Sequence, residues 1–331
     1  MKEIKIKGCS NDSSIFVGES LDNLSKYIGD RNSVIITDEK VSKLYGDRFP
    51  HSPVIQIGTG EKIKTMDTVL YILRKMVQCS CDRSTLLIGI GGGIVTDIAG
   101  FAASLFMRGI SFGFVSTTLL AQVDASCGGK NGVNLDGFKN MIGVFNQPEF
   151  VICDTSLLST LPDREISCGF AEIIKHAAIF DSAMFKFLSE NYKDALSLDK
   201  DIVDKLVYDS VVIKSNIVNQ DETEQGVRKK LNFGHTYGHA IEKITDYNHG
   251  EAISIGMVIA AKASGISEAE DLSNLLQKYN LPVNIGKNIQ ITDALSKDKK
   301  RKSSTIDFVF LSKIGGCYVK NVIIDDVATY L

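Results

Sequence analysis

The sequence predicts an α/β amino-terminal domain with a parallel-rich sheet, followed by a mainly α-helical carboxy-terminal domain. Two observations carry this prediction. Strand and helix patterns alternate up to residue 117, and helical periodicity dominates from residue 163 onward. The chain has 331 residues, enough to bury two cores. We place the domains at residues 1–155 and 156–331.

The first half alternates short apolar runs with amphipathic segments. Apolar runs such as SVIITD are typical of strands buried on both faces. Strands are expected at residues 4–8, 14–18, 33–38, 53–58, 85–90 and 112–117, and Cys153 lies in the strand-like run FVICD. Helices are expected at residues 21–30, 39–49, 64–78 and 95–109. Strands that alternate with helices favour a parallel sheet covered on its faces.

The second half has a different pattern. Helices are expected at residues 163–180, 181–192, 199–220 and 252–269. The segment 305–324 alternates apolar and polar residues as a hairpin does.

Composition narrows the class of protein. Hydrophobic residues make up 44% of the chain and charged residues 23%, with a net charge of −3, which is ordinary for a globular enzyme. This charge does not favour a nucleic-acid partner, and no apolar run is long enough to span a membrane. The amino terminus lacks the apolar core of a signal peptide, so we expect a cytoplasmic protein. The seven scattered cysteines indicate free thiols rather than a disulfide framework.

A glycine-rich turn lies in TLLIGIGGGIVTDIAG, residues 85–100. Glycines between a strand and a helix let backbone N–H groups approach a phosphate, and the helix amino terminus favours negative charge. The pattern therefore suggests a dinucleotide pyrophosphate. Ile94 stands where the dinucleotide fingerprint has its last glycine, so a tight structural turn is an equal alternative.

Histidines cluster in the segment 231–251. Of the chain's five histidines, His235, His239 and His249 lie there, each beside a glycine. Such imidazoles, together with a carboxylate, suit Zn²⁺ with an open coordination position. Spacing favours His235 and His239 as the paired ligands, because residues four apart share one face of a helix. Spacing leaves open which imidazole transfers protons. The candidate carboxylates are Glu172, Glu242 and Glu251.

Six motifs in chain order resemble the 3-dehydroquinate synthase family. They are GGGIVTDIAGFAASLFMRG, STTLLAQVDASCGGK, KNMIGVFNQP, LPDREISCGFAEIIKHA, DETEQGVRKKLNFGHTYGHAIE and NHGEAISIGM. The resemblance covers about residues 85–260. It implies conversion of 3-deoxy-D-arabino-heptulosonate 7-phosphate to 3-dehydroquinate and phosphate in the shikimate pathway. It also implies NAD and a divalent metal, usually Zn²⁺ with Co²⁺ as an alternative.

The resemblance implies a role for each matching residue. The implied metal ligands are Glu172, His235 and His249. The resemblance therefore replaces the pairing of His235 with His239 that spacing favoured. The implied catalytic residues are His239, Glu224, Lys175 and Asp124. The implied substrate contacts are Arg108, Lys130, Asn140, Lys214, Arg228, Asn232 and Lys299, with Lys300 as an alternative to Lys299. The implied NAD contacts are Asp38, Lys40, Glu61, Lys64, Gly91, Gly92, Gly93, Asp97, Thr117, Thr118, Lys139, Leu157 and Thr160. Arg108 resembles an arginine that reaches the phosphate from a partner subunit, so a homodimer is expected.

The chain departs from the family pattern near the substrate loop. Asn131 and Gly132 stand where Thr-Ala is usual, Phe138 precedes Lys139, and Phe106 replaces a common tyrosine. Three rival functions remain: another sugar-phosphate cyclase, a metal-dependent polyol dehydrogenase of the same fold, and a non-catalytic NAD-binding protein with a structural zinc. The number of cations in the motifs favours an anionic substrate over a polyol.

Overall fold

The chain forms two compact units in a computed structural model that describes residues 1–9, 11–286 and 305–327. The first unit comprises residues 1–161 and 214–223, and the second comprises residues 162–213 and 224–331. The boundary expected from the sequence lay at residue 155, without the return of residues 214–223 to the first unit.

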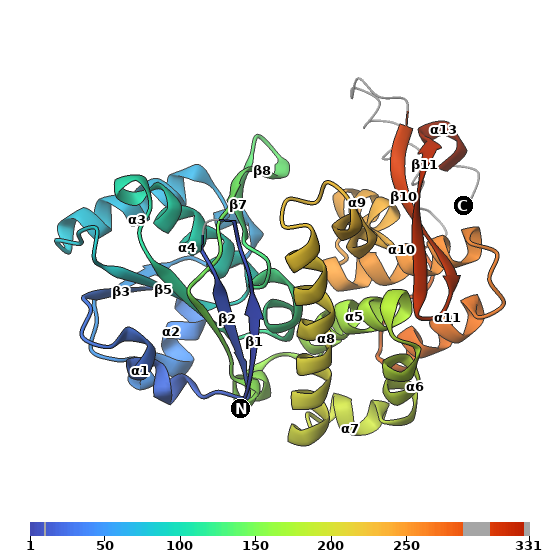
Figure 1. Cartoon of the computed structure of the whole chain (residues 1–331), viewed down its shortest axis with the longest axis horizontal. Coiled ribbons are helices and arrows are strands. Elements are labelled where there is room, and N and C mark those ends of the chain that lie inside the picture. Colours follow the sequence, from blue (N-terminus) through green and yellow to red (C-terminus); the bar gives the residue numbers. More distant parts are fainter. Residues whose placement is uncertain (10, 287–304, 328–331) are drawn as a thin grey trace. The chain divides into compact units, whose positions relative to one another are not determined.

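A seven-stranded sheet organises the first unit (Figure 1). Its strands are β1 (Lys2–Ile6), β2 (Ser13–Val17), β3 (Ser33–Asp38), β4 (Val54–Ile57), β5 (Leu86–Gly91), β6 (Phe112–Ser116) and β9 (Phe150–Cys153). They lie in the order β1-β2-β9-β6-β5-β3-β4, and every pair is parallel except β1 with β2. The connecting helices are α1 (Leu24–Ile28), α2 (Glu39–Tyr45), α3 (Met66–Gln78) and α4 (Gly93–Leu105).

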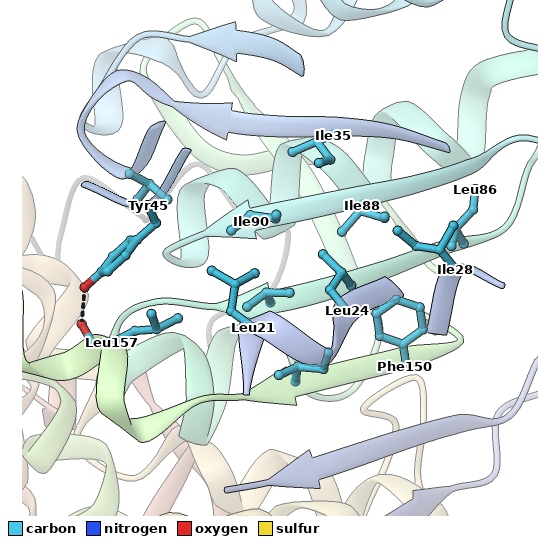
Figure 2. Packing of buried hydrophobic residues seen from close by; sticks show 13 residues of the cluster. Leu21, Leu24, Ile28, Ile35, Tyr45, Leu86, Ile88, Ile90, Phe150 and Leu157 are labelled. Carbon is cyan, nitrogen blue, oxygen red and sulfur yellow. Dashed lines mark hydrogen bonds between the residues drawn. The ribbon is translucent and has the colours of Figure 1, made fainter. Parts of the chain in front are cut away.

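One hydrophobic cluster fills the space between the sheet and the short helices α1 and α2 (Figure 2). Ile88 and Ile90 of β5 pack there against Leu21 and Leu24, and all four are at most 1% exposed. Tyr45 closes the cluster, and its hydroxyl donates a hydrogen bond to the carbonyl of Leu157. Strands buried on both faces explain why the apolar runs of this half are continuous rather than alternating.

Helices make up most of the second unit. They are α5 (Asp163–Phe180), α6 (Ser182–Glu190), α7 (Tyr192–Leu196), α8 (Lys200–Gln220, of which residues 214–220 belong to the first unit), α9 (His235–Ile244), α10 (His249–Ala263), α11 (Ala269–Lys278) and α13 (Ile324–Val327). Helix α10 packs against α5, α9 and α11. Strands β10 (Thr305–Lys313) and β11 (Gly316–Ile323) form an antiparallel hairpin.

The predicted fold class is confirmed, and three details are corrected. The sequence patterns missed the hairpin of β7 (Lys130–Leu135) and β8 (Phe138–Phe145), and they missed α11. The helix expected at 252–269 is α10, which begins three residues earlier because Asn248 caps it, and which ends at Ala263. All seven cysteines are free, as expected. Within the described part of the chain, every helix is too short or too polar to cross a membrane.

Candidate active site

The glycine-rich turn joins β5 to α4 in the first unit. Gly91 ends the strand, Gly92 is the N-cap of the helix and Gly93 is its first residue. A Cβ at Gly91 would lie 2.6 Å from Cβ of Val95, and a Cβ at Gly92 would lie 2.9 Å from Cγ2 of Thr118. Because no side chain fits here, backbone N–H groups at the start of α4 can approach an anion.

A buried ammonium lies beside this turn. The Nζ of Lys64 donates to Oδ2 of Asp97 at 2.6 Å and to Oδ1 of Asn140 at 2.5 Å. Burial raises the pKa of Asp97 to about 6, although the nearby charge of Lys64 opposes this shift. The three side chains come from α4, the β8 strand and the segment after the 3-10 turn Glu61–Ile63. Lys64, Asp97 and Asn140, all implied by the resemblance, are therefore brought together.

Asn134 links this group to a further predicted residue. Its Nδ2 donates to Oε1 of Glu61 at 2.7 Å, and its Oδ1 accepts from the backbone N–H of Asn140 at 2.8 Å. Sequence reasoning missed Asn134. The only signal was its place in the NGVNLDG stretch, where asparagine is typical of turns.

Other predicted NAD contacts have local structural partners. Asp38 caps α2 by accepting from the N–H of Val41 at 2.8 Å, while Lys40 is exposed on that helix. Leu157 is 1% exposed and its side chain belongs to the hydrophobic cluster, so only its backbone is available for a ligand. The hydroxyl of Thr160 lies 2.6 Å from that of Tyr45.

Three further predicted NAD contacts lie in the first unit. Thr117 is buried directly after β6. The Oγ1 of Thr118 accepts from the N–H of Ala121 at 3.2 Å. Lys139 is exposed on β8.

The predicted substrate residues of the first unit differ in burial. Lys214 is buried, and its Nζ donates to the carbonyl of Asp124 at 2.7 Å and to the carboxylate of the same residue. Asp124 lies on a single π-helical turn, a feature found often at functional sites. Lys130 is exposed at the start of β7. Arg108 is exposed with φ +70°, a strained conformation for arginine.

The second unit holds the histidine cluster. The Nε2 of His249 lies 3.4 Å from Oε1 of Glu172, and the Nε2 of His235 lies 3.8 Å from the same oxygen. One ligand atom from each of the three residues lies within 4.8 Å of the others. Glu172 is fully buried, and among the described residues no group meets hydrogen-bond geometry with its carboxylate oxygens. Lys175 forms an ion pair with it.

Burial and neighbouring charges shift the pKa values of the residues in this cluster. Burial alone would raise the pKa of Glu172, but Lys175 and the two imidazoles outweigh it and hold that pKa well below its usual range. Burial, assisted by Lys175, holds the pKa of His235 well below its usual value. Burial would also lower the pKa of His249, but Glu172 and Glu242 outweigh it and raise that pKa to about 9.

Backbone and carboxylate groups orient the two imidazoles. The Nδ1 of His235 lies 3.1 Å from the carbonyl oxygen of Phe233, so Nδ1 carries the proton and Nε2 keeps its lone pair. The Nδ1 of His249 lies 3.8 Å from Oε2 of Glu242, too far for a hydrogen bond but on the side away from Glu172. Glu242 is one of the carboxylates that the sequence analysis gives as candidate ligands. No sequence pattern indicated that the carbonyl of Phe233 would orient His235.

Spacing favoured His239 as a metal ligand paired with His235. Within the described residues, no candidate metal triad contains both His235 and His239, so the structure does not support the pairing that spacing favoured. His239 is exposed, and its ring centroid lies 5.1 Å from that of His235. A second triad of His239, Glu242 and His249 is close enough to hold an ion. The first triad includes the fully buried Glu172 and the second includes the exposed His239, so the first offers an ion the more enclosed position.

The remaining predicted residues of the second unit are also buried or paired. Arg228 is 2% exposed. The Oε1 of Glu224 accepts from Nδ2 of Asn232 at 2.5 Å, and Glu224 has φ +62°. Lys175 is likewise 2% exposed. Lys299 and Lys300 lie outside the described residues.

The donor set of Glu172, His235 and His249 fits Zn²⁺ or Co²⁺. Two imidazoles and one carboxylate are a typical set for a catalytic zinc that keeps an open position. The fixed tautomer of His235 leaves the lone pair of its Nε2 available, as a metal ligand requires.

Comparisons with known proteins point to one family along the chain. Two family models match, 3-dehydroquinate synthase N-terminal at residues 54–168 and 3-dehydroquinate synthase C-terminal at residues 169–301. A 3-dehydroquinate synthase of Alkaliphilus metalliredigens is 40% identical, covering 100% of this chain and 98% of the relative. That of Saccharolobus solfataricus is 40% identical, covering 99% and 97%.

A solved structure is similar over the same length. It is 2-deoxy-scyllo-inosose synthase in complex with carbaglucose-6-phosphate, NAD⁺ and Co²⁺. The TM-score is 0.87 at 25% identity, and the match covers 100% of both chains.

Proposed function

The chain belongs to the 3-dehydroquinate synthase family, and from this premise we propose that it converts 3-deoxy-D-arabino-heptulosonate 7-phosphate to 3-dehydroquinate and phosphate. The reaction is a redox-neutral cyclisation with loss of phosphate, so the enzyme is a carbon–oxygen lyase. The observation that carries the proposal is the fully buried carboxylate of Glu172, whose Oε1 lies 3.4 Å from Nε2 of His249 and 3.8 Å from Nε2 of His235, so that the three side chains can hold one metal ion.

Glu172, His235 and His249 are the proposed metal ligands. A bound Zn²⁺ or Co²⁺ would act as a Lewis acid on a substrate hydroxyl or carbonyl group. The chain's own contribution at His235 is to hold the imidazole neutral and oriented. The carbonyl of Phe233 keeps Nε2 of His235 available, and the lowered pKa of His235 keeps that ring unprotonated at neutral pH.

The glycine turn and its neighbours are the proposed NAD site. NAD would take a hydride from the substrate and return it within one turnover. An added Cβ at Gly91, Gly92 or Gly93 would lie 2.6–2.9 Å from a neighbouring side chain. Without side chains of their own, these residues would let a pyrophosphate approach their backbone N–H groups. The paired Lys64 and Asp97 would orient a polar group of the nucleotide.

His239 and Glu224 are the proposed acid–base groups. An imidazole changes protonation state near neutral pH, and the exposed position of His239 beside the metal ligands supports proton transfer to a bound substrate. The carboxylate of Glu224 is oriented by Asn232. Each would hold or move a proton at carbon-bound hydroxyl groups of the sugar.

A substrate with a phosphate and a carboxylate requires several fixed cations. The proposed contacts are Arg108, Lys130, Asn140, Lys175, Lys214, Arg228, Asn232 and Lys299, together with the carboxylate of Asp124. The burial of Lys214 and Arg228 supports this, because a buried side chain holds its cation in a fixed position for an anionic group. A homodimer, in which Arg108 would reach a partner's substrate, and a cytoplasmic location are part of the same proposal.

The test follows phosphate and reduced nicotinamide together. Zinc-loaded protein is mixed with NAD and the heptulosonate phosphate. Phosphate release over many turnovers without accumulating NADH would support the proposal. Absence of phosphate release with an active metal- and NAD-bound protein would contradict it, and other sugar phosphates would then distinguish a related cyclase. NADH accumulation without phosphate release would indicate the rival polyol dehydrogenase instead.

A further inference from the structure

Three successive turns of α5 contact three consecutive residues at the start of α10. Arg164 contacts Glu251, Cys168 contacts Gly250, and Glu172 contacts His249. Residues four apart share one face of a helix, so these contacts form a single row. The last contact in the row joins two of the proposed metal ligands.

The first contact is a two-pronged ion pair. The Nε of Arg164 donates to Oε1 of Glu251 at 2.8 Å, and Nη2 donates to Oε2 at 2.6 Å. The same Nη2 donates to the carbonyl of Asp246 at 3.1 Å. Glu251 in turn forms a capping box with Asn248. Arg164 therefore holds the loop and the capped first turn that present His249.

The second contact is a backbone hydrogen bond to sulfur at close range. The N–H of Gly250 donates to Sγ of Cys168 at 3.0 Å. A Cβ at Gly250 would lie 2.5 Å from both Cα and the carbonyl oxygen of Cys168. Because Gly250 has no side chain, the start of α10 can lie directly against α5. The Cys168 thiol accepts the hydrogen bond of the buried N–H of Gly250.

We propose that Arg164 and Cys168 are positioning residues that set the distance between His249 and Glu172. This inference rests on the metal triad of the proposed function. Arg164 is 57% exposed, and exposed ion pairs add little to folding stability. Its planar, bidentate geometry instead fixes orientation. Loss of either contact lets the first turn of α10 move on α5, and the pocket for the ion loosens.

The test measures how fast Co²⁺ leaves the protein when excess chelator is added, followed through the visible absorption of the bound ion. Arg164→Gln and Cys168→Ala should each release Co²⁺ about ten-fold faster, at the lower end of the range for residues that support metal ligands. Cys168→Ser keeps an acceptor for the N–H of Gly250 and should restore a rate near that of the parent protein.

A double variant tests whether Arg164 acts through Glu251. Glu251→Gln keeps the capping box but removes the charge. If the two residues act as one unit, Arg164→Gln combined with Glu251→Gln should release Co²⁺ no faster than the single variants. Additive rates would contradict the proposal.

The matched control is Arg31, whose Nη1 lies 2.7 Å from Glu149 in another exposed pair. Arg31→Gln and Arg164→Gln should lower the melting temperature of the metal-free protein equally, by about 2 °C or less. Only Arg164→Gln should change Co²⁺ release. Release at the parent rate in both Arg164→Gln and Cys168→Ala would overturn the inference. If the parent failed to bind Co²⁺, or Glu172→Gln kept it equally well, the metal triad itself would be wrong.

Discussion

The ionisable side chains around Lys64 in the first unit and those around Glu172 in the second unit differ in how they are paired. In the first unit, Lys64 already pairs with Asp97 and Asn140 at hydrogen-bond distance. In the second unit, the fully buried Glu172 forms an ion pair with Lys175 and also lies 3.4 Å from Nε2 of His249 and 3.8 Å from Nε2 of His235. One ligand atom from each of Glu172, His235 and His249 lies within 4.8 Å of the others, close enough to hold an ion. The first cluster thus pairs a cation with an anion directly, and the second also brings three metal-ligating groups together.

The largest expected effect lies in the second cluster. His235→Ala removes a proposed ligand whose tautomer is fixed, so metal affinity should fall by more than about 100-fold. His239→Ala should keep the metal and lose turnover, because His239 is proposed to transfer protons. Metal content after dialysis and turnover are measured on both variants. Equal metal loss in the two would mean that the roles are assigned wrongly.

A smaller effect is expected at the glycine turn. Gly92→Ala introduces a Cβ at 2.9 Å from Thr118, so the turn must shift and NAD affinity should fall about ten-fold. The control is Gly46→Ala, where a Cβ would lie 3.7 Å from Oγ of Ser42. Calorimetric titration with NAD measures both variants. NAD affinity that is equal in Gly92→Ala and the parent would remove the turn from the nucleotide site.

The buried pair in the first cluster should give the protein a distinct pH dependence. The pKa of Asp97 is raised to about 6 in the folded state, above its ordinary value of 3.8. The folded state therefore binds more protons near pH 5, and this contribution to stability is lost as pH rises through 6. Relative to Asp97→Asn, the parent should lose about 2–3 kcal/mol of stability between pH 4 and pH 7. Urea denaturation across that range measures the difference, and a difference that does not change with pH would refute it.

The smallest effect is expected beside the sheet. Tyr45→Phe keeps the ring in the hydrophobic cluster and removes a hydroxyl that contacts Leu157 and Thr160. Stability should fall by about 1 kcal/mol, the usual value of one buried hydrogen bond. Metal retention should not change, since these contacts lie within the first unit. Urea denaturation and metal analysis check the two parts, and loss of metal would contradict the separation of the clusters.

Much of the first unit followed from local patterns. Buried strands such as β5 are continuous apolar runs, and the helices between them are amphipathic, so neither needs distant contacts to be recognised. The β7–β8 hairpin was missed because its strands carry glycines and polar residues. Its pairing depends on Gly132 lying against Gly143, and on Asn131, whose Nδ2 donates to the carbonyl of Asn146 at 2.8 Å.

The metal cluster was harder to derive from residues alone. Clustering pointed to His235 and His249, but helical spacing then paired His235 with His239. The third member of the candidate triad, Glu172, lies on a helix far away in sequence, and no local rule relates α5 to α10. The family resemblance supplied it, and the contact between Gly250 and Cys168 gives the physical reason that the two helices meet.

The ion pair between Lys175 and Glu172 has a consequence for the order of assembly. An isolated buried carboxylate would strongly oppose folding, whereas one matched by an ammonium does not. Lys175 therefore supplies the counterion of Glu172 without a metal ion, and we expect the chain to fold before the ion binds.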